Sequence, residues 1–293
     1  MSLSRFVMSL MVAGALLGGC AKPPSQHSAL GKGRDQTPLI TNSIVQPSYP
    51  ATDQPMPERI FSSSHLGGRT LALASTADII LRPGEVVLTF DDGPRPGKTD
   101  QVLATLDDFG VKATFLMLGS SAQAHPQLAK QVALAGHTVG SHTFSHVDLN
   151  TLGRQAAVYE IAKGERAVTK ALAGSGQSLA PFFRFPYLSQ TGFLRTSMMQ
   201  GGVVVLDVDI DSKDYYRDSP ATVAARTLTR LEQRGSGIIL FHDIHQRTAD
   251  MLPDFLQQLA DRGFSVVRLV PKDRGVFGRD VITADAPGLG GIF

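Results

Sequence analysis

Residues 86–94 read Val-Val-Leu-Thr-Phe-Asp-Asp-Gly-Pro, and this stretch decides how the rest of the chain is interpreted. Its first five residues are apolar or β-branched at consecutive positions, which predicts a strand buried on both faces, as in a parallel sheet. Two aspartates and a Gly-Pro turn signal follow where that strand ends. Six more short apolar runs follow along the chain, at 113–118, 137–140, 182–185, 203–208, 237–241 and 264–269.

Apolar residues at helical spacing lie between most of these runs. The predicted helices cover 99–109, 126–135, 151–172, 192–200, 220–234 and 248–262. Strands that alternate with helices in this way predict an α/β domain with parallel strands. The glycine fingerprint of dinucleotide-binding sheets is missing, which favours a barrel over an open sheet. We therefore expect a (β/α) barrel with about seven parallel strands over residues 81–270.

The overall composition excludes several classes of site. The net charge is +2 and no dense run of Lys or Arg occurs, so we expect no nucleic-acid partner. Cys20 is the only cysteine, which excludes a disulfide within the chain and a cysteine-rich zinc site. The chain has no Trp and only five Tyr, so stacking against a sugar ring would have to use Phe or Tyr.

The first 20 residues predict export. Arg5 precedes an apolar or small stretch at 6–19, which is typical of a signal peptide and too short for a spanning helix of ~20 residues. The ending Leu-Gly-Gly-Cys20 resembles the lipobox of bacterial lipoproteins, in which the cysteine is lipidated. We expect a membrane anchor on Cys20, at the periplasmic face of the outer membrane if the host has two membranes, because Ala21 replaces the aspartate of inner-membrane retention. The alternatives are a plain signal peptide or an uncleaved anchor.

Two polar segments flank the predicted domain. Residues 21–80 begin with a stretch rich in Pro, Ser, Gln, Gly and Thr, which predicts a tether and then a lead-in to the domain. Residues 271–293 form a Gly-rich tail. The chain therefore divides into a signal peptide, a tether, one folded domain and a tail.

Ionisable residues gather where the apolar runs end. In a parallel α/β barrel these carboxyl ends of strands meet at one rim, where active residues lie. The residues in question are Asp91, Asp92, His142, His146, Arg184, Pro186, Tyr187, Asp211, Asp214, His242 and Asp243.

His142 and His146 are four residues apart and would face the same way on one helical turn. One carboxylate would complete three protein ligands and leave a position open, as in catalytic zinc sites. The adjacent Asp91 and Asp92 point apart at a strand end, so one can bind a metal while the other acts as general base on an activated water. The alternative for Asp-Asp-Gly is an Asx turn or a helix cap. The Glu of a His-Glu-x-x-His protease helix is missing.

Hydrolysis of an amide also requires an acid, because the amine leaves protonated. His242 suits this role since the ordinary histidine pKa is ~6.5. A buried carboxylate beside it would keep it protonated, and Asp214 could provide that carboxylate.

Five ordered segments resemble the motifs of the polysaccharide deacetylase family, carbohydrate esterase family four, over residues 83–269. The segments are Thr89-Phe-Asp-Asp-Gly-Pro94, His142-Thr-Phe-Ser-His146, Arg184-Phe-Pro-Tyr187, Asp211-Ser-Lys-Asp-Tyr215 and Leu240-Phe-His-Asp243. The resemblance implies a distorted (β/α) barrel with about seven strands.

The resemblance also implies a role for each matching residue. Asp91 would be the base, Arg184 its orienting partner, and His242 the acid tuned by Asp214. Tyr187 would stabilise the oxyanion through its backbone N–H. The implied metal ligands are Asp92, His142 and His146, and the implied substrate-contacting residues are Pro186, Tyr215 and Leu240, the last as the wall of the acetyl pocket.

Two positions depart from the family pattern. Tyr215 stands where the family usually has Trp, and Leu188 stands where it often has Gly. We expect these changes to affect packing at the acetyl pocket and the sugar subsite. Neither change removes a group that the chemistry needs.

The expected function is metal-dependent hydrolysis of N-acetyl groups from an N-acetylglucosamine-containing polysaccharide, with release of acetate. Zinc is the expected metal, although an Asp-His-His set also accepts Co, Ni, Mn or Fe. The alternatives are an O-acetyl esterase acting on a xylan-type glycan, and a catalytically silent glycan-binding lipoprotein. In each case the partners are a glycan and, through Cys20, a membrane.

Overall fold

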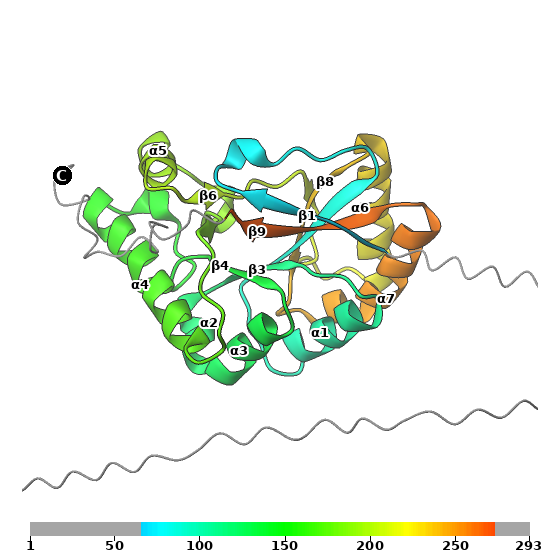
Figure 1. The fold of residues 1–293 in the computed structure, drawn as a ribbon, viewed down its shortest axis with the longest axis horizontal. Helices are drawn as coiled ribbons and strands as arrows, with labels where there is room; N and C mark the ends of the chain where they lie inside the picture. Colours follow the sequence, from blue (N-terminus) through cyan, green and yellow to red (C-terminus); the bar gives the residue numbers. More distant parts are fainter. Residues whose placement is uncertain (1–65, 273–293) are drawn as a thin grey trace, which may run out of the picture. The chain divides into compact units, whose positions relative to one another are not determined.

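A computed structural model describes residues 66–272 of the chain. The predicted signal peptide, the lipidation site at Cys20, most of the tether and residues 273–293 of the tail lie outside these residues. Helices and strands alternate along the described segment (Figure 1). No helix between residues 66 and 272 is long and apolar enough to cross a membrane.

Nine strands, all paired in parallel, form the sheet of the described segment. Seven of them run in the order β7-β8-β2-β3-β4-β5-β6, while β9 pairs with the start of β2 and β1 pairs with β9. The strands are β1 (Gly67–Leu73), β2 (Glu85–Asp91), β3 (Thr114–Met117), β4 (Thr138–Ser141), β5 (Phe182–Phe183), β6 (Val204–Val205), β7 (Ile210–Asp211), β8 (Gly237–His242) and β9 (Ser265–Pro271).

The predicted α/β fold with parallel strands is confirmed, with two additions. The strand β1 lies within the expected lead-in and was not recognised, because most of its side chains are exposed and it lacks a continuous apolar run. The two-residue strand β7 is too short to leave a pattern. No pairing closes the described sheet between β6 and β7, so the barrel is open there.

Seven α-helices cover the outside of the sheet (Figure 1). The short helix after β3 was not expected, because its six residues are mostly small and polar. The helices are α1 (Thr99–Asp108), α2 (Gly119–Ala124), α3 (Pro126–Leu134), α4 (Arg154–Leu172), α5 (Gly192–Gln200), α6 (Pro220–Arg234) and α7 (Gln246–Asp261).

Alternation along β2 divides the core into layers. Val86, Leu88 and Phe90 belong to the large cluster that packs against the helices, whereas Val87 belongs to a second cluster inside the sheet. β1 and β9 also contribute to this inner cluster, so they help to fill the barrel interior. The strands are therefore packed on both faces, and their carboxyl ends lie at one end of this packed core.

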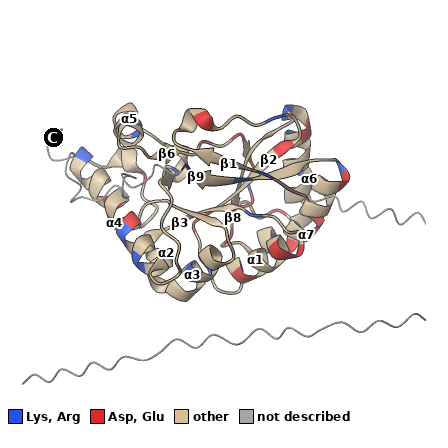
Figure 2. Ribbon diagram, viewed as in Figure 1, with Lys and Arg blue, Asp and Glu red and all other residues tan. Residues whose placement is uncertain are grey.

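Charged residues of both signs lie on the outer helices (Figure 2). α4 carries the basic residues Arg154, Lys163, Arg166 and Lys170 and the acidic residues Glu160 and Glu165, while the acidic residues of α1 are Asp100, Asp107 and Asp108. Acidic residues also mark α7 in Figure 2. These surface charges are separate from the ionisable groups that gather at the strand ends.

Two glycines allow α2 and α4 to pack under the loop that follows β4. A Cβ atom on Gly119 would lie 2.7 Å from the Cα of Gly164. A Cβ on Gly164 would lie 2.4 Å from the backbone carbon of Thr143, which is next to His142. Backbone atoms cannot move away as a flexible side chain can, so this crossing sets the height of the His142 loop above the helices.

We expect Gly164→Ala to lower the free energy of unfolding by about 1–3 kcal/mol, because the added methyl group overpacks the crossing. Urea denaturation would measure this change. Gly192→Ala is the matched control, since a Cβ on Gly192 meets nothing within 4 Å. An unchanged urea midpoint in Gly164→Ala would show that the crossing tolerates a side chain.

Candidate active site

Strand register brings the ionisable residues together in pairs. Asp91 at the end of β2 is aligned with His242 at the end of β8. Ser141 at the end of β4 is aligned with Phe183 of β5, so the next residues, His142 and Arg184, emerge side by side. The predicted rim of functional residues therefore follows from parallel pairing alone.

Asp92, His142 and His146 form a cluster that fits a divalent metal. Their nearest ligand atoms all lie within 4.8 Å of one another. The Nε2 atoms of both histidines lie 3.6 Å from Oδ1 of Asp92, and that buried oxygen has no hydrogen-bond partner. Burial lowers the pKa of His146, which favours the neutral imidazole that a metal requires. Oxygen and nitrogen donors of this kind suit several divalent metals.

The backbone carbonyl of Arg184 orients one of these ligands. It lies 2.7 Å from Nδ1 of His142. In the tautomer that suits this contact, Nδ1–H donates to the carbonyl and the lone pair of Nε2 faces Asp92. Metal-bound histidines generally have such a partner on the second ring nitrogen.

The loop between the histidines differs from the expected helical turn. Residues 142–146 are not helical, and Thr143 and His146 have positive φ values of 69° and 58°. Asp92 also has a positive φ, of 76°. Such backbone angles cost free energy in residues other than glycine and concentrate at functional sites. The two imidazoles still converge, because the conformation of this loop, and not one face of a helix, brings them together.

Asp91 is held beside the cluster by a buried arginine. Nη1 of Arg184 donates to Oδ1 of Asp91 and to Oγ1 of Thr89, both at 2.8 Å. Nε of Arg184 donates to the Leu206 carbonyl at 3.0 Å, and both Arg184 and Asp91 are buried. The second oxygen of Asp91 lies 3.8 Å from Nε2 of His142. One carboxylate oxygen is thus anchored while the other faces the cluster.

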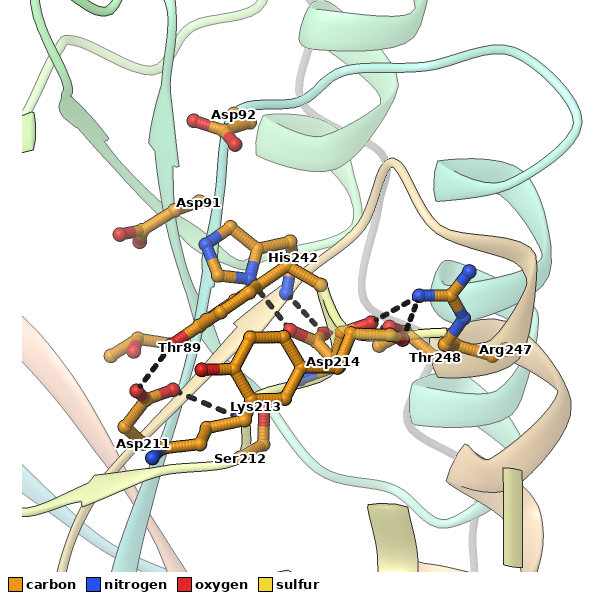
Figure 3. A network of polar contacts seen from close by, with 12 residues as sticks. Thr89, Asp91, Asp92, Asp211, Ser212, Lys213, Asp214, His242, Arg247 and Thr248 are labelled. Atoms are coloured by element: carbon orange, nitrogen blue, oxygen red, sulfur yellow. Dashed lines mark hydrogen bonds and ion pairs between the residues drawn. The ribbon is translucent and has the colours of Figure 1, made fainter. Parts of the chain in front are cut away.

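His242 and Asp214 form a second pair, in which Asp214 is fully buried and His242 is partly exposed (Figure 3). Nδ1 of His242 lies 2.7 Å from Oδ1 of Asp214, and Thr248 donates to the other oxygen at 2.6 Å. Burial opposes the charged imidazole, but the hydrogen bond and charge of Asp214 outweigh it and raise the pKa of His242 to about 9. The result is an imidazolium whose Nε2–H is available to a ligand.

A third buried carboxyl supports the turn that carries Asp92. Asp243 is fully buried, and Oγ1 of Thr99 donates to its Oδ2 at 2.6 Å. A Cβ on Gly93 would lie 2.1 Å from that oxygen, so only glycine fits above it. Burial raises the pKa of Asp243 to about 7. The Gly93 position of the motif is therefore a packing requirement as well as a turn signal.

A cavity of about 480 Å³ opens onto these groups. Among the residues expected at the substrate, Tyr187, Tyr215 and Leu240 line it, whereas Pro186 is buried and is not part of its lining. Arg184 and Asp214 lie behind the lining residues that they contact. The full lining is Asp91, Asp92, His142, His146, Phe185, Tyr187, Leu188, Asp211, Tyr215, Leu240, His242 and His245.

The structure adds lining residues to which no role was assigned from the sequence. Phe185 and Asp211 fall within recognised motifs, and that position is the signal that could have identified them. Leu188, where glycine is common in the family, has a φ of 56° and is partly exposed at the cavity. Tyr215 donates from its hydroxyl to Oδ2 of Asp211 at 2.9 Å, and its ring lies 5.7 Å from that of His242.

Known proteins resemble this chain in sequence. The family model for polysaccharide deacetylases matches residues 80–206. A chitin deacetylase of Colletotrichum lindemuthianum is 31% identical over 219 residues, which cover 70% of this chain and 86% of that enzyme. A peptidoglycan N-acetylmuramic acid deacetylase of Bacillus subtilis is 32% identical over 186 residues, which cover 62% of this chain and 37% of that protein.

A solved structure agrees with the sequence matches. The peptidoglycan deacetylase of Bdellovibrio bacteriovorus superposes with a TM-score of 0.61 and 35% identity, over 72% of this chain and 57% of that one. The chain spans less than two thirds of this protein and of the B. subtilis relative, but 86% of the fungal enzyme. With the fold, the family match and the fungal relative in agreement, this chain belongs to the polysaccharide deacetylase family, carbohydrate esterase family four.

Proposed function

We propose that this protein hydrolyses N-acetyl groups of an N-acetylglucosamine-containing polysaccharide and releases acetate, with a divalent metal held by Asp92, His142 and His146. One observation carries the proposal. Asp91, anchored by Arg184, and His242, paired with Asp214, lie at aligned strand ends beside that ligand cluster. A base and an acid thus flank one cavity, which is the arrangement that amide hydrolysis needs.

The roles of the residues follow from their contacts. A divalent metal bound at the cluster supplies Lewis-acid polarisation and lowers the pKa of water, and zinc is the first choice. The free oxygen of Asp91 accepts the proton of the attacking water, while Arg184 keeps the carboxylate oriented. The backbone N–H of Tyr187 donates to the developing oxyanion. Leu240 and Tyr215 form the walls of the space for the acetyl methyl group. Pro186 fixes the start of the Tyr187 turn.

His242 completes the reaction by protonating the amine as the C–N bond breaks. Its partner Asp214 is fully buried and receives three hydrogen bonds, from the His242 ring, the His242 backbone and Thr248. When an O-acetyl ester is hydrolysed, the leaving group is an alcohol, which needs less help from an acid than an amine does. The support of His242 by Asp214 therefore favours an amide substrate over a xylan-type ester. A silent glycan-binding role is disfavoured because the side chains of the proposed base, the proposed acid and the proposed metal ligands all line one cavity.

We also propose that the protein is exported and tethered to the cell envelope by a lipid on Cys20. The support is the sequence pattern of residues 1–20. Cells fed a radiolabelled fatty acid should label the wild-type protein, and Cys20→Ser should lose the label. Equal labelling of both proteins would contradict the anchor.

Acetate release from N-acetylated glucosamine oligomers tests the catalytic proposal directly. We expect the zinc-loaded chain to release acetate, and Asp91→Asn to retain zinc but lose about 10²–10⁴ in kcat, the usual contribution of a general base. Alanine at Asp92, His142 or His146 should abolish both zinc binding and activity. Full activity in all three alanine variants would contradict the ligand set, and faster release from O-acetylated xylan would favour the esterase.

The pH dependence tests the pairing of His242 with Asp214. The pKa of His242 is raised from an ordinary value of ~6.5 to about 9, so its protonated form stabilises the fold fully below ~6.5 and this contribution is lost as pH rises through about 9. kcat/KM should fall over the same alkaline range. Asp214→Asn removes the negative charge that keeps the pKa of His242 high in spite of burial. The alkaline fall in kcat/KM of this variant should therefore move to lower pH. An unmoved alkaline fall would show that another group is the acid.

A further inference from the structure

The loop between the two candidate histidine ligands lies against helix α4. The backbone of Thr143 is so close to Gly164 that a Cβ on this glycine would lie 2.4 Å from the Thr143 carbonyl carbon. At the next loop residue, Nζ of Lys163 lies 3.7 Å from the centre of the Phe144 ring. Helix α4 therefore supports this loop at successive residues, although none of the described cavity lining comes from α4.

Glu160 of α4 makes a third contact, with the residue directly before His146. Its Oε1 accepts both the backbone N–H and the hydroxyl of Ser145, each at 2.6 Å. Hydrogen bonds to a carboxylate are shorter and stronger than hydrogen bonds between neutral groups. Glu160 thus restrains the backbone and the side chain of Ser145 at the same time.

His146 depends on its backbone for its orientation more than His142 does. The His142 ring is held through Nδ1 by the carbonyl of Arg184. Within residues 66–272, the His146 ring forms no hydrogen bond that would hold it in the same way. Its backbone has a positive φ of 58°, and such a conformation persists only where the surrounding structure enforces it. The residues that restrain the chain next to His146 therefore set the direction of its imidazole.

We infer that Glu160 is a positioning residue for the metal cluster, which holds Ser145 so that the His146 imidazole faces the other ligands before a metal binds. This inference rests on the proposed metal site and extends it to a residue outside the cavity lining. Loss of a residue that orients a metal ligand typically weakens metal binding by about 10–100-fold. Glu160 acts through the residue next to the ligand, so we expect an effect at the lower end of this range.

Zinc affinity of the purified full chain, measured by competition with a chromogenic chelator, tests the inference without any glycan. We expect Glu160→Ala to raise the Kd for zinc about tenfold. Glu160→Gln should raise it less, because the amide oxygen of glutamine can still accept from Ser145. The matched control is Glu232→Ala, which removes a helix glutamate that pairs with Arg262 away from the cavity lining, and this variant should keep the wild-type Kd.

Urea denaturation of the metal-free proteins separates positioning from folding. Glu160→Ala and Glu232→Ala each remove one carboxylate from an outer helix, so their urea midpoints without zinc should be alike. A midpoint of Glu160→Ala well below that of Glu232→Ala would assign Glu160 to the stability of the fold and overturn the inference. Glu160→Gln keeps the hydrogen-bond acceptor, so it provides a folded variant for the zinc measurement.

Failure of the inference and failure of the proposed function give different results. An unchanged zinc Kd in Glu160→Ala, or the same rise in Glu232→Ala, overturns the inference while acetate release by the wild-type chain upholds the proposed function. A raised Kd in Glu160→Ala alone, in a chain that releases acetate from no glycan, upholds the inference and contradicts the proposed function. A wild-type chain that binds no zinc and no other divalent metal overturns both.

Discussion

The buried guanidinium of Arg184 is the constraint on which the active site depends. Its Nη1 binds Asp91 and Thr89, its Nε binds the Leu206 carbonyl, and its own carbonyl receives Nδ1–H of His142. One residue therefore positions both the base and a metal ligand. A charge that is only 1% exposed must be compensated, and removal of one partner from such a pair typically costs ~3–5 kcal/mol. The site is consequently rigid before any ligand binds.

Parallel strands and close-packed helices supply the rest of that rigidity. The register of β2 with β8 and of β4 with β5 fixes which residues are neighbours. The Gly119–Gly164 crossing supports the His142 loop from below. Positive φ angles at Asp92 and His146 show that loop strain is accepted where the ligands converge. Sites built on such supported elements hold their geometry better than sites on free loops.

Much of this could be predicted from the sequence, and the omissions have physical causes. Continuous apolar runs revealed the buried strands, since burial on both faces requires them. The strand β1 could not be predicted, because most of its side chains are exposed and it has no continuous apolar run. The histidine pair was recognised, but the loop conformation between its members depends on tertiary contacts and not on spacing.

The most direct test of the account is the position of the metal. Anomalous diffraction at the zinc edge from crystals of the zinc-loaded chain should reveal an ion bound to a carboxylate oxygen of Asp92 and to Nε2 of His142 and His146, at ~2.0–2.2 Å. Asp91 should remain paired with Arg184 in the same crystals. An ion bound elsewhere, or no ion in crystals of an active preparation, would contradict the account.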